Sequence, residues 1–482
     1  MHRTPALEAL TRIFAANADK HLLILPDNSS VTYREFWERS EKQAQLLAES
    51  GCKAGDRLLV QLENSERLLE LYLACAIGGF VACPIDPATP KEQIAKLTSM
   101  LSPAMSVTQK ELDWFQKEPS SRVDFGTGER EEDYLVIFSS GSTGQAKGIV
   151  HTLASITESA KAFAQLSGLN SASVVYHHFP MFYMAGLFNM FLAPLHVGAT
   201  IVVGPRFSKS TMLRFWELPQ KHGVNSLTLT PTMAASLCQL YRRDNSVLEH
   251  VAKYQSIAST SSVLYQSIAE RFGATFKVPL RNCYGVSEVG ATITMQAWED
   301  ALAFQSMGGW SEEVEIRAGS ESAPEEILVK TPFMAKGYLI GGALQKLTDP
   351  EGFFHTGDLG YIKNGLLFFS GRENDLLKKG GEFVSTQAIE ELALKNVLVT
   401  EVAVVGVPDE FWGSRLALFY VPQKDVAESE ILAVFDELFL KGLRDIERPD
   451  KIVPVPWMPK TSIGKIKKRD LLDKYSVGPQ LR

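Results

Sequence analysis

The chain has 482 residues and is about three times as long as a typical domain, so we expect at least two domains. Hydrophobic residues make up 45% and charged residues 22%, which is typical of a globular protein with a large core. The net charge of −7 argues against nucleic acid and anionic membranes as partners, and no apolar run approaches the roughly 18 residues of a membrane helix.

The N-terminal stretch MHRTPALEALTRIFAANADKH alternates charged and apolar residues at helical spacing. It lacks the apolar core and the small-residue cleavage site of a signal peptide. The cysteines are odd in number and contain no CxxC pair, which favours free thiols over a disulfide framework or a zinc site. We therefore expect a cytoplasmic protein.

Short apolar runs typical of buried strands recur between helical patterns in the first part of the chain. The strand candidates are residues 57–61, 135–138, 200–203 and 226–229, and the helix candidates include residues 32–50 and 66–77. Alternation of this kind predicts an α/β fold with mostly parallel sheets flanked by helices.

The pattern changes near residue 371. A strand-like run at 365–370 is followed by the polar stretch 371–375, which is the best linker candidate. Beyond it we expect a helix at 387–394, a strand at 401–407 and a helix at 428–440. We therefore predict a large N-terminal domain, residues 1–372, and a small α+β C-terminal domain, residues 373–482.

The stretch SSGSTGQAKG, residues 139–148, combines glycines, hydroxyls and a lysine behind an apolar run. A Walker A loop would need glycine at Ala146 and a hydroxyl at Gly148, so a P-loop ATPase does not fit. Glycines still let backbone N–H groups turn toward an anion, and the lysine adds charge. The stretch is therefore either a phosphate-binding loop or a Ser/Gly-rich surface loop.

The order of these residues resembles the phosphate loop of the adenylate-forming superfamily, [ST]-S-G-[ST]-T-G-x-P-K-G, with Ala146 in place of proline. This superfamily contains acyl- and aryl-CoA ligases, adenylation domains of peptide synthetases and firefly luciferase. Further motifs follow in the family order: NCYGVSE at 282–288, FHTGDLG at 354–360, GRENDLLKKGG at 371–381 and PKTSIGK at 459–465. Weaker matches, VTYREF, LAESGCKAGDRLLV and FMAKGY, extend the resemblance over nearly the whole chain.

The resemblance implies an ATP site. Its residues would be Ser139, Ser140, Gly141, Ser142, Thr143, Gly144, Lys147, Ser262, Asn282, Tyr284, Gly285, Asp358 and Arg372. Asp358 would bind the ribose hydroxyls, since a buried carboxylate accepts from both. Ser287 would touch the phosphates, and Glu288 would hold Mg²⁺, which prefers carboxylate ligands. Lys465 would be the catalytic lysine and would neutralise charge on the α-phosphate and the attacking carboxylate.

The same resemblance implies a two-step reaction and a mobile small domain. A carboxylate first attacks ATP to give an acyl-adenylate and pyrophosphate, and a thiol then displaces AMP. Asn374 would be the hinge that exchanges Lys465 for a thiol tunnel at Gly380 and Gly381, where paired glycines suit a thin pantetheine arm. CoA and the phosphopantetheine of a separate acyl carrier protein present the same arm, so both acceptors stay open.

The segment HHFPMFYMAGL, residues 177–187, resembles the family segment that lines the acid pocket and places Tyr183 and Met184 there. Met184 stands where amino-acid-activating relatives carry an aspartate for the substrate ammonium, and methionine cannot supply that charge. The neighbouring apolar residues, Phe182, Ala185 and Leu187, either line a pocket for an uncharged group or belong to the core.

Thr260 and Ser261, in STSSVL at 259–264, replace glycines that let the substrate pass close to the backbone in relatives. Their side chains should narrow the pocket or add hydrogen bonds. We therefore expect a small carboxylic acid as the substrate rather than a long fatty chain.

These observations predict an AMP-forming acid–thiol ligase that uses ATP, Mg²⁺ and CoA or phosphopantetheine. One alternative is a stand-alone adenylation enzyme that loads a separate carrier protein in a specialised-metabolite assembly line. Another is a catalytically inactive relative that only binds nucleotide. The intact set Lys147, Glu288, Asp358, Arg372 and Lys465 argues against that last alternative.

Overall fold

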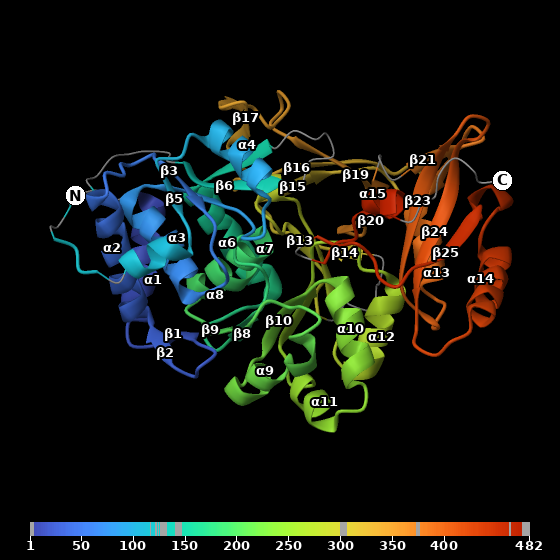
Figure 1. Ribbon diagram of the computed structural model, residues 1–482, viewed down its shortest axis with the longest axis horizontal. Coiled ribbons are helices and arrows are strands. Elements are labelled where there is room, and N and C mark those ends of the chain that lie inside the picture. The colour runs from blue at the N-terminus through green and yellow to red at the C-terminus, as the bar shows by residue number, and fades with distance from the viewer. Residues whose placement is uncertain are drawn as a thin grey trace.

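The computed structural model describes residues 4–115, 117–120, 123, 125, 133–139, 147–298, 306–372, 376–461 and 464–474. Figure 1 shows a large N-terminal domain and a smaller C-terminal domain at one end of the molecule. Across the described ranges, no helix combines the length and the apolar character required to cross a membrane.

The first sheet of the large domain has eight strands in the order β13-β12-β11-β10-β8-β9-β1-β2. The strands are β1 His21–Ile24, β2 Ser30–Thr32, β8 Val174–His177, β9 Thr200–Val203, β10 Ser226–Leu229, β11 Ser256–Ser259, β12 Arg281–Tyr284 and β13 Thr294–Met295. The six strands from β12 to β1 are parallel, and only the two edge pairs are antiparallel.

The second sheet has seven strands in the order β18-β17-β7-β6-β4-β3-β5. The strands are β3 Arg57–Val60, β4 Val81–Pro84, β5 Met105–Val107, β6 Asp133–Ser139, β7 Lys147–Thr152, β17 Gly337–Ile340 and β18 Ala343–Gln345. The run β6-β4-β3-β5 is parallel, and β7, β17 and β18 continue the sheet antiparallel.

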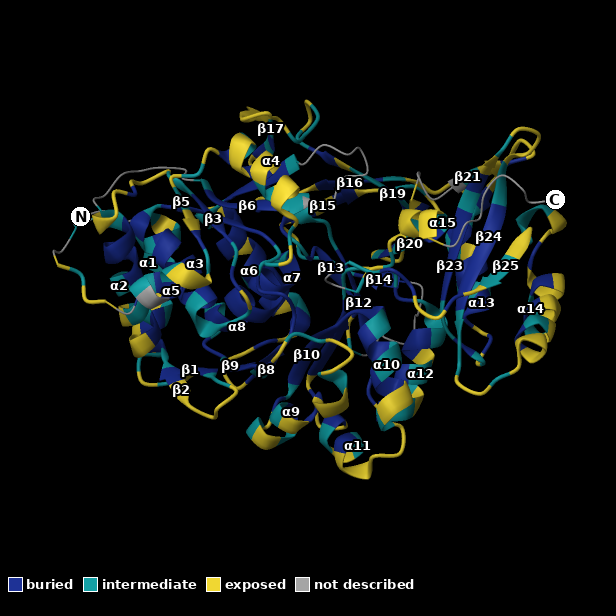
Figure 2. Ribbon diagram, in the orientation of Figure 1, coloured by how far each residue is buried: buried dark blue, intermediate teal, exposed yellow. Residues whose placement is uncertain are grey.

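Helices cover these sheets, and Figure 2 shows mostly buried strands in the interior and outer helices, such as α9 and α11, with both exposed and buried residues. The α-helices are α1 Pro5–Ala16, α2 Tyr33–Glu49, α3 Glu66–Gly78, α4 Lys91–Leu101, α5 Gln109–Trp114, α6 Leu153–Ser167, α7 Met184–Leu187, α8 Ala193–His196, α9 Glu217–His222, α10 Pro231–Tyr241, α11 Asn245–Val251 and α12 Gln266–Phe276. Short 3-10 turns are η2 Met212–Arg214 and η3 Ser287–Val289, and η1 Phe188–Leu192 is a π-helix.

A third sheet of the large domain is antiparallel throughout and has the order β14-β20-β19-β16-β15. The strands are β14 Ser306–Gly308, β15 Glu315–Arg317, β16 Glu325–Lys330, β19 Phe354–Lys363 and β20 Leu366–Arg372. The sequence patterns predicted only the last of these strands. This sheet leads directly into the small domain (Figure 1).

The small domain contains the three-stranded sheet β23-β24-β25, the hairpin β21-β22 and helices on its surface. Its elements are β21 Leu376–Lys379, β22 Glu382–Ser385, α13 Thr386–Ala393, β23 Val399–Asp409, β24 Gly413–Pro422, α14 Glu428–Gly442, η5 Asp445–Glu447, β25 Lys451–Pro454 and α15 Lys468–Lys474. These bounds agree with the predicted helix at 387–394, strand at 401–407 and helix at 428–440. The unit has its own apolar core, as an α+β domain requires.

The predicted helix at 32–50 is α2, and its start has a clear local cause. The Thr32 hydroxyl accepts from the Glu35 N–H at 3.2 Å, and the Glu35 carboxylate accepts from the Thr32 N–H at 2.7 Å. This reciprocal capping box satisfies two N–H groups that a helix start otherwise leaves without partners.

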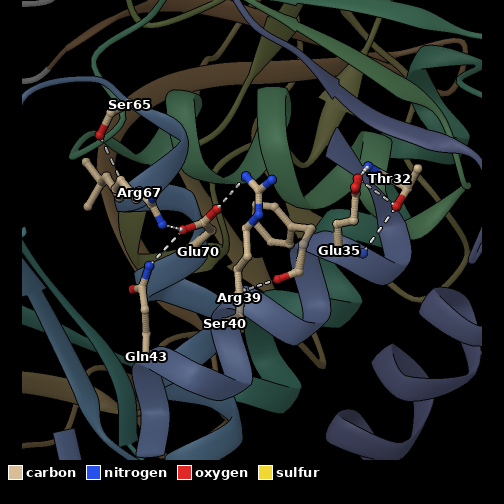
Figure 3. A network of polar contacts seen from close by, with 10 residues as sticks. Thr32, Glu35, Arg39, Ser40, Gln43, Ser65, Arg67 and Glu70 are labelled. Atoms are coloured by element: carbon tan, nitrogen blue, oxygen red, sulfur yellow. Dashed lines mark hydrogen bonds and ion pairs between the residues drawn. The ribbon is translucent and has the colours of Figure 1, made fainter. Parts of the chain in front are cut away.

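The packing of α2 against α3 includes a buried charge. Glu70 on α3 is fully buried and accepts from Gln43 Nε2 at 2.8 Å and from Arg67 Nη1 at 3.1 Å (Figure 3). Arg39 Nη1 lies 3.6 Å from the other carboxylate oxygen. Burial raises the pKa of Glu70, and the two arginines oppose that rise.

We expect Arg67→Met to lower the free energy of unfolding by about 1–3 kcal/mol, because it leaves a buried carboxylate with less compensation. The double variant Arg67→Met/Glu70→Leu should recover most of that loss, since it removes the charge together with its partner. Urea unfolding measures both. Lys96→Met breaks an exposed pair with Glu92 and should change stability little. Equal losses in the single and double variants would contradict this account.

Candidate active site

A cavity of about 1550 Å³ lies between the two domains. The loops that follow β8, β10, β11 and β12 line it, so it opens at the carboxyl ends of the parallel strands. Ligands of open α/β sheets bind at this edge, because the loops there are free to present polar groups. The strands therefore determine where the cavity lies, and the side chains of the loops determine which ligands it can bind.

Most of the site residues predicted from the sequence line this one cavity. They are Tyr183, Met184, Thr260, Ser261, Ser262, Asn282, Tyr284, Gly285, Ser287, Glu288, Asp358, Arg372 and Lys465. Ser139 ends β6 and pairs with Lys147 at the start of β7. The predicted phosphate-loop residues Ser140, Gly141, Ser142, Thr143 and Gly144 and the predicted hinge Asn374 lie outside the described residues.

Asp358 is a buried carboxylate with two fixed donors. The Tyr284 hydroxyl donates to Oδ2 at 2.8 Å, and Arg372 Nε donates to Oδ1 at 2.7 Å. The pairing of β19 with β20 sets Asp358 directly opposite Arg372. Each carboxylate oxygen keeps a further lone pair, so this group can accept from a hydroxyl pair while its charge stays compensated.

The backbone next to Tyr284 requires glycine. A Cβ at Gly285 would lie 1.5 Å from the carbonyl oxygen of Ala291, which leaves no room for any side chain. Steric crowding therefore requires glycine at this position of NCYGVSE. The glycine allows the turn that carries Ser287 and Glu288 to line the cavity.

Glu288 is held by a residue that the sequence reasoning missed. The Tyr338 hydroxyl donates to Glu288 Oε1 at 2.9 Å, and Lys147 Nζ lies 5.4 Å from the centre of the Tyr338 ring. Burial, with Glu288 adding to it, raises the pKa of Tyr338, so the hydroxyl stays a donor. Tyr338 is the last residue of the motif FMAKGY, and this motif was the sequence feature that could have identified it as a site residue.

A neutral histidine supports the same turn. His151 Nε2 lies 2.9 Å from the carbonyl oxygen of Ser287, and burial lowers the pKa of His151 to about 4. The carbonyl can only accept, so Nε2 carries the proton of the neutral ring. The turn at 287–288 is thus held by a hydrogen bond from His151, a residue of β7.

The carboxylate of Glu288 fits a divalent cation whose other ligands come from a bound nucleotide. Within the described part of the chain, no group of three or more His, Cys, Asp or Glu side chains could hold a metal on its own. Mg²⁺ commonly takes one or two carboxylates, with substrate phosphates and water completing its shell. A single cavity carboxylate fits that mode.

Only part of the predicted acid-pocket segment lines the cavity. Phe182, Tyr183, Met184 and Ala185 line the cavity, whereas Leu187 is fully buried in the core. Leu187 therefore belongs to packing and not to the pocket lining.

Ser261 has a φ of +74°, a conformation that usually favours glycine. The structure therefore retains the backbone of a glycine position while adding a polar side chain to the pocket. Backbone strain of this kind persists where surrounding contacts hold it.

The small domain brings Lys465 into the cavity. The turn that carries it is closed by the Thr461 N–H donating to the Lys465 carbonyl at 2.8 Å. Across the domain boundary, the Tyr265 hydroxyl donates to Glu390. Within the small domain, Lys468 Nζ lies 2.8 Å from the same carboxylate. Figure 1 shows α15 facing the large domain and α14 on the outer side.

Gly380 and Gly381 do not line this cavity. They border a separate shallow depression beside Phe411 and Trp412 on the small domain. A Cβ at Gly380 would lie 2.8 Å from the Trp412 ring, so the chain passes close under the indole. In this arrangement the candidate lysine is at the site and the candidate thiol tunnel is away from it.

Residues 10–339 match the family model of the AMP-binding enzymes, and residues 388–465 match that of the AMP-binding enzyme C-terminal domain. The chain belongs to the AMP-binding enzyme family.

Its curated relatives include a 2-succinylbenzoate–CoA ligase of Oceanobacillus iheyensis, 25% identical, with 96% of this chain and 98% of the relative covered. An oxalate–CoA ligase of Arabidopsis thaliana is also 25% identical, with 96% of each chain covered. Among solved structures, ATP-bound MatB from Rhodopseudomonas palustris has a TM-score of 0.85 at 22% identity, with 98% of this chain and 99% of that chain covered.

The predicted superfamily and the α/β fold with its two unequal domains are confirmed by these matches, as is the enzyme class of AMP-forming acid–thiol ligase. The roles of individual site residues stay predictions.

We expect Asp358→Asn to weaken ATP binding by about tenfold or more, because hydrogen bonds to a charged acceptor contribute more than neutral ones. Calorimetric titration of ATP in the absence of acid substrate measures the dissociation constant. Glu351→Gln, an exposed carboxylate paired with Arg317, is the matched control and should leave ATP affinity unchanged. Unaltered ATP affinity in a folded Asp358→Asn variant would exclude this residue from the nucleotide site.

Proposed function

We propose that this protein joins a small carboxylic acid to the thiol of CoA at the expense of ATP. In the first step the acid carboxylate attacks the α-phosphorus, the bond to the β-phosphate oxygen breaks, and acyl-adenylate and pyrophosphate form. In the second step the thiol attacks the acyl carbon and AMP leaves. The observation that carries this proposal is the convergence of Asp358, Glu288, Met184 and Lys465 on one cavity.

The nucleotide end of the cavity supports this assignment through its acceptors and donors. Asp358, held by Tyr284 and Arg372, would accept from the ribose hydroxyls. Lys147 and the hydroxyls of the phosphate loop would carry the β- and γ-phosphates. Glu288 would hold Mg²⁺, which when bound would neutralise phosphate oxygen charge.

Lys465 would act on the reacting centre itself. Its ammonium would stabilise the negative charge shared by the α-phosphate and the incoming carboxylate, and preorganised charge of this kind is a major source of catalysis. The hydrogen bond from Tyr265 of the large domain to Glu390 would help keep the small domain, and so Lys465, in place. Lys468 would compensate the charge of that carboxylate within the small domain.

The second step would need a rotation of the small domain about the boundary at 372–373, with Asn374 as hinge. An apolar surface beside the paired glycines supports this: Phe411 is 82% exposed and Phe383 66% exposed. Exposed aromatic side chains near a passage for pantetheine suit a face that becomes covered during the reaction.

The names of the curated relatives support CoA as the acceptor. A separate acyl carrier protein is the alternative acceptor, and comparing the two thiols in one assay separates them.

The cytoplasmic location stays a prediction, and all five cysteines are buried and unpaired, in line with the expected free thiols.

We expect Lys465→Ala to slow acyl-adenylate formation by roughly 100-fold or more, since it removes charge from the first transition state. Thioester formation from a synthetic acyl-adenylate should stay largely intact, because Lys465 acts in the first step. Rapid-quench assays of the two half-reactions measure both. Lys441→Ala, on the outer helix α14, is the control. Similar losses in both half-reactions would contradict the domain rotation.

We expect α-amino acids to be poor substrates beside des-amino acids of the same shape. Met184 is buried and cannot compensate an ammonium, and an unpaired buried charge is costly. Acid-dependent exchange of labelled pyrophosphate into ATP tests phenylalanine against 3-phenylpropanoate and alanine against propionate. A clear preference for the amino acid in each pair would overturn the proposed apolar pocket.

A further inference from the structure

A hydrogen bond joins the large domain to the part of the small domain that carries Lys465. The Tyr265 hydroxyl donates to Glu390 Oε2 at 2.5 Å. Tyr265 belongs to the large domain, and Glu390 lies on α13 of the small domain. The Tyr265 side chain also packs against the apolar cores of both domains. It is therefore a direct contact across the boundary that the proposed rotation would have to break.

The backbone fixes Tyr265 in the large domain. Tyr265 is the N-cap residue of α12. Its carbonyl accepts from the Ile268 N–H at 3.0 Å and from the Ala269 N–H at 3.2 Å, as expected where a helix begins. The hydroxyl is thus presented to the small domain from the start of a regular helix.

The small domain fixes the other partner. Glu390 is only 4% exposed, and its Oε1 accepts from the Val404 N–H at 2.6 Å and lies 2.8 Å from Lys468 Nζ. Oε1 is thus used within the small domain, and Oε2 is the oxygen that accepts from Tyr265. Lys468 begins α15, three residues after Lys465. The carboxylate therefore connects Tyr265 to the segment that carries the candidate catalytic lysine.

Release of this contact would cost free energy. A hydrogen bond to a charged acceptor contributes more than a neutral one, and a carboxylate oxygen that loses its donor needs water in its place. The hydroxyl therefore favours the arrangement in which Lys465 lines the cavity over one in which the small domain has rotated away. A contact that favours one arrangement raises its population at the expense of the other.

We infer that Tyr265 is a positioning residue that sets the balance between the two half-reactions. Its hydroxyl stabilises the adenylate-forming arrangement through Glu390 and must release this carboxylate before the thiol can react. The inference rests on the proposed function and deepens it, because it assigns control of the domain rotation to a side chain outside the hinge.

The test is Tyr265→Phe, which removes the hydroxyl and keeps the ring. Rapid-quench assays at saturating substrate follow adenylate formation from the most active acid of a panel that includes benzoate, propionate and 3-phenylpropanoate. The same assays follow thioester formation from the corresponding synthetic adenylate and CoA. The ratio of the thioester rate constant to the adenylate rate constant should rise by about tenfold or more, because the hydroxyl stabilises only one arrangement. The KM for the acid should be unchanged.

Tyr241→Phe is the matched control, since the Tyr241 hydroxyl donates to the Met212 carbonyl within the large domain. It should leave the ratio unchanged. Glu390→Gln gives a second measurement, because it replaces the charged acceptor with a neutral one. In that background Tyr265→Phe should change the ratio less than it does in the wild-type enzyme.

An unchanged ratio in Tyr265→Phe would overturn the inference and leave the proposed function intact, and so would a proportional loss in both half-reactions. A rise in the KM for the acid alone would make Tyr265 a substrate contact and also overturn it. The same change of ratio with glutamate and with glutamine at position 390 would overturn the assigned partner. A wild-type enzyme that forms no adenylate from any acid of a broad panel would overturn the proposed function itself.

Discussion

The site depends on parallel strands that all end at one edge of a sheet. β8, β10, β11 and β12 run the same way, so the loops that follow them gather in one place. Backbone groups beyond the last ladder bond need other partners, and polar side chains and close turns supply them. The acid-pocket segment, the turn at 260–262 and the turn at 285–288 are therefore neighbours although they are far apart in the sequence.

The proposed reaction also requires a small domain that brings Lys465 to this edge in the first step and withdraws it before the second. Glu390 is buried at the contact between the domains and accepts from Tyr265 of the large domain and from the backbone N–H of Val404. Lys468 compensates its charge three residues after Lys465.

Much of the fold could be predicted because local signals agree with the tertiary structure. Residues 200–203 and 226–229 are short apolar runs, and they coincide with β9 and β10. The third sheet was missed except for β20, because its other strands are partly exposed and obtain their partners from distant segments. Burial in β16, for example, alternates over only six residues, which is a weak pattern on its own.

The candidate site was predicted from motifs. The structure adds the contacts between distant segments and the burial of single residues, which motifs do not show. Tyr338 meets Glu288 only because β17 pairs with β7, a contact between segments almost 190 residues apart. The core position of Leu187, close to residues that line the cavity, is likewise a tertiary feature that the apolar residue type alone did not predict.

The proposed reaction requires ATP to be cleaved between the α- and β-phosphates. The most direct measurement incubates the protein with ATP, Mg²⁺, CoA and a panel of small acids, and separates the nucleotides and thioesters by ion-exchange and reversed-phase chromatography. AMP, pyrophosphate and acyl-CoA should form in equal amounts and only when an acid is present. Formation of ADP and inorganic phosphate in proportion to acyl-CoA would contradict the account.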